Sequence, residues 1–286
     1  MNRICIVGAG GYVGLHLAAA LRSRGIDVLG LSSRDGTGID PATGLLPPGL
    51  RLDGVDAVVY AAQSPHYRDV PQMAWHLQSV ACVAAMQAAT AAVRAGARRF
   101  IYLSTGNVYE SSFEAHAETA PVSGAQWYPL SKLQGEQSVS MLRSYLDVSI
   151  VRIFAIYGPQ QPDKLVPKLT ASVDQRRTVT LGYREKGVPD AGLRLNPCYI
   201  DDAVAVLEQL ALEGGPQVLN LAGPEIVGVR DIAQAWGRLR DIEPVFAEDA
   251  NTRSFDLIGD TALLRQFTSR RFLTPAEGLA RMAEAG

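Results

Sequence analysis

A tyrosine and a lysine four positions apart could form an acid–base pair. The segment Tyr128-Pro129-Leu130-Ser131-Lys132 places a phenol and an ammonium at a spacing that shares one face of a helix. Pro129 is compatible with this helix if it lies in the first turn. A nearby ammonium favours the phenolate, lowers the pKa of the tyrosine and makes it usable near neutral pH. The same spacing also occurs on ordinary surface helices, so the pair needs support from other residues.

Hydroxyl groups follow a strand-like run upstream of this pair. The run Arg99–Leu103 leads into Ser104-Thr105-Gly106-Asn107. Open α/β sheets bind ligands outside the carboxyl ends of their strands, so these side chains are expected beside a substrate. We therefore predict that Thr105, Tyr128 and Lys132 form the catalytic group, and that Thr105 and Asn107 contact the substrate.

A glycine-rich segment near the start of the chain predicts a phosphate-binding loop. Gly8, Gly11 and Gly14 follow a strand-like run and open a helical pattern, with Tyr12 and Val13 between them. Glycines there permit a sharp turn and close approach of the backbone to a pyrophosphate, while the helix N-terminus offers N–H groups. The alternative is a tight turn without a ligand, but the surrounding strand and helix favour a dinucleotide site.

The residues after the second strand-like run favour NADP over NAD. NAD-binding chains usually carry an acid there for the ribose hydroxyls. Here Ser32, Ser33 and Arg34 follow Leu31, and no acid comes before Asp35. Hydroxyls and a guanidinium suit a 2′-phosphate, which an acid would repel. The alternative is that Arg34 is a solvated loop residue and Asp35 holds the ribose.

These residues must be positioned by a sheet, and the hydrophobic pattern predicts one. Over about 155 residues, short apolar runs alternate with helical patterns, which is typical of a Rossmann-type doubly wound parallel sheet in the α/β class. The predicted strands are Ile4–Val7, Val28–Leu31, Ala57–Tyr60, Arg99–Leu103 and Val148–Phe154. The predicted helices are Gly11–Arg24, Gln72–Gly96 and Trp127–Leu146.

The pattern changes beyond residue 158. We predict helices at Leu165–Val173, Asp201–Leu212, Val229–Arg240 and Pro275–Ala285, strands at Thr178–Leu181 and Gln217–Leu221, and a loop at Gly182–Asn196. Residues 1–158 would form the dinucleotide-binding domain, which about 198–222 would rejoin. Residues 159–197 and 223–286 would form a smaller, mixed substrate-binding lobe.

Composition excludes several classes of function. The 286 residues carry a formal net charge of −2, which indicates no general attraction to nucleic acid or anionic lipid. Three distant cysteines predict neither a disulfide framework nor a metal site. The N-terminus is unlike a signal peptide, and the alanine-rich run Ala81–Ala95 is interrupted by polar residues, which favours a buried helix over a membrane span. We expect a cytoplasmic protein with a small-molecule substrate.

Taken together, the motifs resemble those of the extended short-chain dehydrogenase/reductase family, which includes sugar-nucleotide epimerases, dehydratases and reductases. The resemblance spans nearly the whole chain. Its motifs are the glycine loop, Ser104-Thr105 before Val108-Tyr109, the Tyr128–Lys132 pair, Val151-Arg152 leading to Tyr157-Gly158-Pro159, Tyr199-Ile200-Asp201-Asp202, Asn220–Gly223 and Thr274–Leu279.

The resemblance implies a role for each matching residue. Tyr128 would exchange a proton with the reacting oxygen, Thr105 would orient that oxygen, and Lys132 would bind the nicotinamide ribose and lower the pKa of Tyr128. Ser104 would line the nicotinamide pocket, and Asp202 would be structural. Further cofactor contacts would come from the segment after the third strand, Ala61, Ala62 and Gln63. Related enzymes often form homodimers through two helices, here within Met73–Arg94 and Trp127–Leu146.

Departures from the family pattern narrow the reaction. The 4,6-dehydratases carry an Asp-Glu pair after the threonine, where this chain has Gly106-Asn107, which argues against dehydration. Epimerases usually carry an acid after the second strand, and it is missing here. The leading hypothesis is therefore reduction of a keto group of a nucleotide-linked sugar by NADPH. An epimerase remains an alternative.

The substrate is less well defined by the sequence. Sugar-nucleotide enzymes of this family often carry Asn where this chain has Ala155, and an arginine that is here shifted by one, to Arg194. We predict Arg194 and Asn196 as substrate contacts. Lys164 and Lys168 are further candidates, although a solvated helix face explains them as well. A ketoreductase for a non-nucleotide carbonyl compound and a non-catalytic NADP-binding regulator are the other hypotheses.

Overall fold

The computed structural model describes residues 3–185 and 192–285, which form two compact units. The first unit comprises the residues up to Val108 together with Pro121–Arg152 and Val204–Leu219. The second comprises Tyr109–Ala120, Ile153–Ala203 and the residues from Asn220 onward. The other boundaries lie three to six residues from the predicted ones, and Tyr109–Ala120 belongs to the second unit instead of the first. The reason is local pairing, because His116 donates its backbone N–H to Ile258 O and Tyr109 Oη donates to Asn220.

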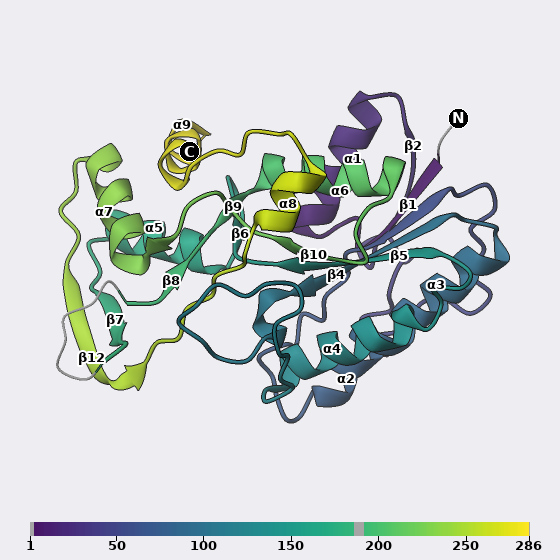
Figure 1. The fold of residues 1–286 in the computed structure, drawn as a ribbon, viewed down its shortest axis with the longest axis horizontal. Helices are drawn as coiled ribbons and strands as arrows, with labels where there is room; N and C mark the ends of the chain where they lie inside the picture. Colours follow the sequence, from purple (N-terminus) through teal and green to yellow (C-terminus); the bar gives the residue numbers. More distant parts are fainter. Residues whose placement is uncertain (1–2, 186–191, 286) are drawn as a thin grey trace. The chain divides into compact units, whose positions relative to one another are not determined.

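The first unit is built on a six-stranded sheet, and the predicted α/β fold class is confirmed (Figure 1). The strand order is β10-β5-β4-β3-β1-β2, and β2, β1, β3 and β4 pair in parallel. The strands are β1 Arg3–Val7, β2 Asp27–Leu31, β3 Ala57–Tyr60, β4 Arg99–Thr105, β5 Asp147–Ile153 and β10 Val218–Leu221. Their β-branched and aromatic residues suit a sheet that is covered on both faces.

Helices cover both faces of this sheet (Figure 1). Helices α1 and α6 lie on one face, and α2, α3 and α4 lie on the other. Their bounds are α1 Tyr12–Ser23, α2 Ala74–Gln78, α3 Ala84–Arg94, α4 Trp127–Ser140 and α6 Ile200–Glu213. The connection from β2 to β3, residues 32–56, contains neither a helix nor a strand. It must therefore be held by individual contacts.

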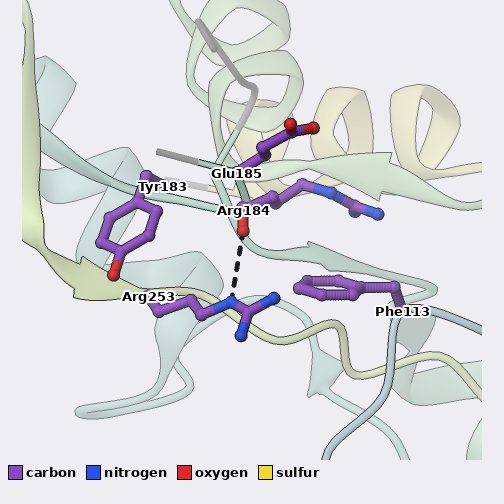
Figure 2. A pocket seen from close by; sticks show the side chains of 5 residues that line it. All are labelled: Phe113, Tyr183, Arg184, Glu185 and Arg253. Carbon is purple, nitrogen blue, oxygen red and sulfur yellow. Dashed lines mark hydrogen bonds between the residues drawn. The ribbon is translucent and has the colours of Figure 1, made fainter. Parts of the chain in front are cut away.

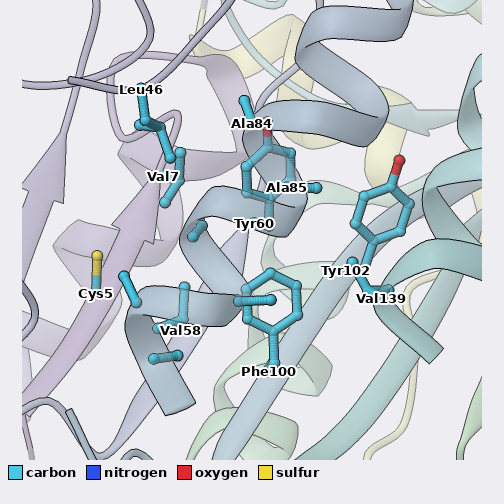
Figure 3. Packing of buried hydrophobic residues seen from close by; sticks show 14 of the residues in the cluster. Cys5, Val7, Leu46, Val58, Tyr60, Ala84, Ala85, Phe100, Tyr102 and Val139 are labelled. Atoms are coloured by element: carbon cyan, nitrogen blue, oxygen red, sulfur yellow. The ribbon is translucent and has the colours of Figure 1, made fainter. Parts of the chain in front are cut away.

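Aromatic residues of β3 and β4 form the centre of the core beneath α3. Tyr60 stacks on Phe100 and Tyr102, with ring centroids 6.3 and 5.8 Å apart (Figure 3). Buried alanines such as Ala84 and Ala85 allow α3 to approach these rings closely. Large aromatic side chains thus fill the core from the sheet, and small alanine side chains line it on the helix.

The predicted helix Gln72–Gly96 is interrupted by one turn of π-helix, Ser79–Val83, between α2 and α3. Two buried phenols stabilise this turn, because Tyr60 donates to Val80 O and Tyr102 donates to Ala81 O. The run Ala74–Arg94 is long and apolar enough to cross a bilayer by length and composition, but over half of it is buried in the unit, as in a core helix.

The second unit combines short strand pairs with helices. β6 Ile156–Tyr157 pairs with β9 Cys198–Tyr199, β7 Val179–Tyr183 with β12 Phe246–Arg253, and β8 Arg194–Leu195 with β11 Val227–Gly228. Its helices include α5 Leu165–Asp174, α7 Val229–Arg240, α8 Ala262–Phe267 and α9 Pro275–Ala285.

Several elements differ from the sequence prediction. The predicted loop Gly182–Asn196 contains the end of β7 and all of β8, while its residues 186–191 lie outside the described part of the chain. Strand β12 was not predicted because its sequence, FAEDANTR, is polar and mostly exposed. The helix predicted to run to Leu146 ends at Ser140, and the chain then continues in turns.

Candidate functional site

Tyr128 and Thr105 come together at the carboxyl end of β4. Tyr128 lies in the first turn of α4, where Pro129 is tolerated as predicted, and Thr105 is the last residue of β4. The hydroxyl of Thr105 hydrogen bonds to the phenol of Tyr128. The ring of Tyr67 lies beside that of Tyr128, with centroids 5.8 Å apart. Two of the three predicted catalytic residues are therefore in direct contact.

The pKa of Tyr128 is shifted in the opposite direction from the one predicted. Burial raises this pKa to about 12, the hydrogen bond from Thr105 opposes the rise, and Tyr67 adds to it. The predicted lowering of this pKa by Lys132 is wrong for this structure, because burial is the largest cause of the shift and raises the pKa. At neutral pH the phenol of Tyr128 is thus protonated, as a proton donor must be.

Lys132 is buried and points toward the sheet. Its Nζ donates to Leu103 O at 2.9 Å and to Ala62 O at 3.3 Å, and it lies 5.1 Å from the ring centroid of Tyr102. Leu103 lies in β4, and Ala62 follows β3 and packs against Gly8 of the glycine loop. Lys132 is therefore fixed at the end of the sheet where a dinucleotide would lie.

Ser104 belongs to a buried polar network behind the predicted catalytic residues. Its hydroxyl donates to the carboxylate of Glu136 on α4, and Arg152 on β5 forms an ion pair with the same carboxylate at 2.8 Å. Both charged side chains are more than nine-tenths buried. This network joins β4, α4 and β5, so Ser104 holds the end of β4 in place, a role beyond the nicotinamide contact predicted for it.

The glycine loop forms a cradle that side chains would fill. Gly8 adopts φ +90°, and a Cβ there would come within 2.9 Å of Ala62. A Cβ on Gly14 would come within 2.9 Å of Ala9 Cα. The N-cap of α1 is Gly11, which has no capping side chain, and the first turn carries no acid. The residues present therefore fit the phosphates of a dinucleotide, whose charge the helix N-terminus would favour.

The residues after β2 lie against this loop. Ser32 Oγ accepts the backbone N–H of Arg34 at 3.1 Å. A Cβ on Gly10 would come within 3.3 Å of Arg34 Cδ, so the exposed arginine extends over the glycine loop. Asp35 is instead bound to Thr37, which donates both its hydroxyl and its N–H and lowers the pKa of the carboxyl. Ser33 is exposed beside them.

The segment after β3 links the glycine loop to Lys132. The backbone N–H of Ala61 donates to Val7 O, Ala62 packs under Gly8, and Ala62 O accepts from Lys132. Gln63 is exposed. The sequence-predicted cofactor residues and the catalytic group thus belong to one unit and converge on one end of its sheet.

The predicted substrate residues differ in their surroundings. Asn107 is exposed in the turn after β4, whereas Arg194 and Asn196 belong to the second unit. Both ends of the Asn196 amide bind the backbone of Gly259, which makes Asn196 a structural residue. Arg194 forms an ion pair with buried Asp256 at 2.6 Å. Asp202 has the structural role predicted for it, since it accepts from Arg270 and from the N–H of Leu273.

The second unit contains a cavity of about 470 Å³ that the sequence did not reveal. It is lined by Phe113, Tyr183, Arg184, Glu185 and Arg253 (Figure 2). The guanidinium groups of Arg184 and Arg253 lie 4.6 and 5.3 Å from the ring centroid of Phe113. These residues are far apart in the sequence, so no local spacing could have indicated them.

The charges around this cavity favour an anionic ligand. Arg184 and Arg194 share the single carboxylate of Asp256, whose side chain is fully buried. Arg253 donates to Arg184 O at 3.2 Å (Figure 2). Among these described residues, the guanidinium groups of Arg184, Arg194 and Arg253 outnumber the carboxylates of Asp256 and Glu185. Arginines beside aromatic rings are suited to phosphate groups and planar rings.

Known proteins are similar to this chain in both sequence and fold. It is 25% identical to the uncharacterized UDP-glucose epimerase YtcB of Bacillus subtilis, with 87% of this chain and 88% of the relative covered. It is 32% identical to a dTDP-4-dehydrorhamnose reductase of Mycobacterium tuberculosis, with coverage of 79% and 71%. The structure of TunA, an NAD-dependent NDP-hexosamine 5,6-dehydratase, superposes with a TM-score of 0.81 at 25% identity and covers 99% of this chain and 97% of that one.

The family model for the NAD dependent epimerase/dehydratase family matches residues 4–222, which include the glycine loop, Thr105, Tyr128 and Lys132. Relatives in this family are enzymes that act on sugar nucleotides. The chain described here belongs to the NAD dependent epimerase/dehydratase family.

Proposed function

We propose that this enzyme reduces a keto group of a nucleotide-linked sugar with NADPH, using Tyr128 as the proton donor. The observation that carries the proposal is the arrangement after β2. Arg34 extends over Gly10 of the glycine loop, and the nearby acid Asp35 is bound to Thr37. This surface favours a 2′-phosphate, and NADPH is the form of the dinucleotide that supplies reductases with electrons.

The catalytic group suits reduction. A bound NADPH would supply hydride to the carbonyl carbon. The protonated phenol of Tyr128 would give its proton to the carbonyl oxygen, which completes the alcohol. The hydroxyl of Thr105, already hydrogen bonded to Tyr128, would hold the same oxygen in line. Lys132, fixed by Ala62 O and Leu103 O, would hold the nicotinamide ribose.

Neighbouring residues support reduction over dehydration. Thr105 is followed by Gly106 and an exposed Asn107, so this turn supplies no acid or base for the loss of water. An epimerase is the second candidate, because YtcB carries that name and TunA is NAD-dependent. Epimerisation begins with oxidation of an alcohol, which needs the phenolate of Tyr128, and the raised pKa of Tyr128 disfavours that form.

We place the nucleotide part of the substrate in the cavity of the second unit. The excess of guanidinium groups there suits a diphosphate, and the ring of Phe113 could stack against a base. The arginine predicted for this purpose, Arg194, is one step removed, because it helps Asp256 to hold the cavity-lining Arg184. A non-nucleotide ketone would leave this charged cavity without a purpose.

A panel of nucleotide-linked 4-keto sugars and 4-hydroxy sugars, incubated with NADPH, NADH or NAD⁺, tests the proposal. We expect oxidation of NADPH in step with formation of a 4-hydroxy sugar. Interconversion of two 4-hydroxy epimers with no net change in the dinucleotide would establish the epimerase instead. NADH turnover at least about tenfold faster than NADPH turnover would overturn the cofactor assignment.

We further propose that the chain forms a homodimer through α2, the π-helical turn Ser79–Val83 and α4. Large apolar side chains are exposed along these helices and the turn after α4, namely Trp75, Val83, Trp127, Met141 and Tyr145. Such an exposed apolar surface is typical of an interface between subunits. Light scattering should give about twice the mass of the chain, and Met141→Glu should shift the protein toward the monomer. A wild-type monomer at micromolar concentration would refute the dimer.

A further inference from the structure

A buried histidine joins two loops at one end of the sheet. His76 lies in α2 and is only 1% exposed. Its Nε2 lies 3.0 Å from Pro41 O in the connection after β2. Its Nδ1 lies 2.8 Å from Ser64 Oγ in the segment after β3. One imidazole therefore bridges Pro41 and Ser64, which lie 23 positions apart in the sequence with β3 between them.

The direction of these hydrogen bonds is fixed by chemistry. A carbonyl only accepts, so Nε2 carries the proton and donates to Pro41 O. In the neutral ring Nδ1 then accepts from the hydroxyl of Ser64. Ser64 Oγ in turn accepts the backbone N–H of His66 at 3.1 Å. Burial lowers the pKa of His76, which is consistent with this neutral form.

Each bridged loop carries residues of the proposed site. The connection after β2 begins with Ser32 and Arg34, and the segment after β3 begins with Ala62, which contacts Gly8 and Lys132. The segment after β3 then continues through Ser64 to Tyr67, whose ring lies beside the catalytic Tyr128. Both loops follow the carboxyl ends of strands that flank β1, where a dinucleotide would bind.

Individual contacts must hold the connection after β2, because residues 32–56 form neither helix nor strand. Two side chains do so, one from α2 and one from α3. His76 donates to Pro41 O, and Gln87 Oε1 accepts the backbone N–H of Leu46 at 3.0 Å. Gly44 packs against His76 so closely that a Cβ there would come within 3.3 Å of its ring. Side chains of α2 and α3 thus hold a connection that has no secondary structure of its own.

We propose that His76 is a positioning residue with two separable effects. Through Pro41 it holds the connection that presents Arg34 to the dinucleotide, and through Ser64 it holds the segment that presents Tyr67 to Tyr128. The inference rests on the proposed function for the identity of the ligand. It assigns to His76 and Ser64 a role in the reaction although neither touches the reacting atoms.

Isosteric variants can separate the two effects. The amide oxygen of Asn can replace Nδ1, so His76→Asn keeps the bond to Ser64 and loses the bond to Pro41. The amide nitrogen of Gln can replace Nε2, so His76→Gln keeps the bond to Pro41 and loses the bond to Ser64. Ser64→Ala removes the second bond without changing the histidine. His116→Asn is the control, since His116 is also buried but lies in the second unit, stacked on Tyr109.

Two readouts distinguish positioning from stability. NADPH binding is followed by the fluorescence of the dinucleotide, and kcat is measured on the keto sugar that the wild-type enzyme reduces. We expect His76→Asn to raise the Kd for NADPH by about tenfold with kcat nearly unchanged. We expect His76→Gln and Ser64→Ala to lower kcat by about tenfold with Kd nearly unchanged, because small misplacements near the chemistry have large effects on rate. His116→Asn should change neither value in the folded fraction.

The outcomes separate this inference from the proposed function. Failure of the wild-type chain to bind NADPH would refute the proposed function, and the inference with it. Wild-type binding, together with His76 and Ser64 variants that are less stable but have unchanged Kd and kcat per folded molecule, would overturn the inference alone. If both His76 variants raised the Kd for NADPH and lowered kcat by equal factors, the inference would also be overturned, because the two effects would then not be separable.

Discussion

The hydroxyl of Thr105 hydrogen bonds to the phenol of Tyr128, and this bond opposes the burial that raises the pKa of Tyr128 to about 12. The two residues lie at the meeting point of β4 and α4. Thr105 also accepts the backbone N–H of Asn107 at 3.2 Å, which fixes the orientation of its hydroxyl. The phenol is therefore aimed by the sheet and kept protonated by its surroundings.

The first prediction concerns the pH dependence of the reaction. Because the pKa of Tyr128 is raised to about 12, the phenol is protonated throughout the neutral range, and reduction should show no ionisation of Tyr128 between about pH 6 and pH 9. The reverse oxidation needs the phenolate, so its rate should rise about tenfold per pH unit over the same range. Initial rates in both directions check this.

Variants of the two residues supply the controls for this pH dependence. Tyr128→Phe should lower kcat by about 10²- to 10⁴-fold while NADPH binding is kept, since only the proton transfer is lost. Thr105→Val should also lower kcat, and Thr105→Ser, which keeps a hydroxyl, should restore most of it. Full activity in Tyr128→Phe would refute the mechanism.

The second prediction concerns the choice of dinucleotide. Arg34→Ala should raise the Kd for NADPH by about 10- to 100-fold, because a charge-assisted contact to the 2′-phosphate is lost. The Kd for NADH should stay nearly constant. Arg51→Ala is a matched control, because Arg51 is an exposed arginine of the same connection whose partner is Asp53. Equal effects of Arg34→Ala on both dinucleotides would remove the basis for NADP preference.

Local signals predicted the strand end and the helix that bring Thr105 and Tyr128 together, whereas tertiary contacts decided the rest of the candidate site. The signals for these residues are local, namely the spacing of Tyr128 and Lys132 and the strand before Thr105. The structure brings Thr105 and Tyr128 into contact. The partners of Lys132 could not be predicted, because Leu103 and Ala62 are placed by the pairing of strands. The direction of the shift in the pKa of Tyr128 depends on these tertiary contacts, so the predicted lowering was wrong.

The second unit was predicted less completely for the same physical reason. Arg194 was chosen by its motif position, but Asp256, 62 residues later, takes up its charge. The cavity is built from the end of β7, from β12 and from the segment that holds Phe113. The pattern predicted most of β7 as the strand Thr178–Leu181, but β12 is mostly exposed and shows no strong periodic pattern. Sequence periodicity reports on burial along one element, so it does not indicate sites made by several exposed elements.

The third prediction concerns the buried network behind the site. Glu136→Gln should destabilise the protein by about 3–5 kcal/mol, because it breaks the buried ion pair with the guanidinium of Arg152. Urea unfolding measures this effect. Asp53→Asn is the control, since Asp53 pairs with Arg51, both side chains are more than two-thirds exposed, and the loss should cost less than about 1 kcal/mol. Similar losses in the two variants would show that the Glu136 pair contributes little.

The fourth prediction concerns strain at Ala155. This residue adopts φ +46°, a left-handed conformation that disfavours a residue with a Cβ by about 1–2 kcal/mol. Ala155→Gly should therefore stabilise the protein by up to about 1 kcal/mol, after allowance for the flexibility of glycine in the unfolded chain. Ala88→Gly, in the middle of α3, should have the opposite sign. A loss of stability in Ala155→Gly would show that the conformation is not strained.

The last prediction concerns the cavity of the second unit. Arg253→Met should raise the KM for a nucleotide-linked sugar by about tenfold or more, because one of the two guanidinium groups beside Phe113 would be lost. Phe113→Leu should also raise KM, since it removes the ring on which both arginines rest. Neither change should alter the Kd for NADPH, because the predicted dinucleotide residues belong to the first unit.

Arg230→Met is the matched control for Arg253→Met. Arg230 also lies over an aromatic ring of the second unit, 4.5 Å from the centroid of Phe246, but it does not line the cavity. Its loss removes a comparable arginine–aromatic contact and should leave KM unchanged. If Arg230→Met and Arg253→Met raise KM equally, the effect arises from the packing of the unit. A selective effect of Arg253→Met assigns the cavity to the anionic part of the substrate.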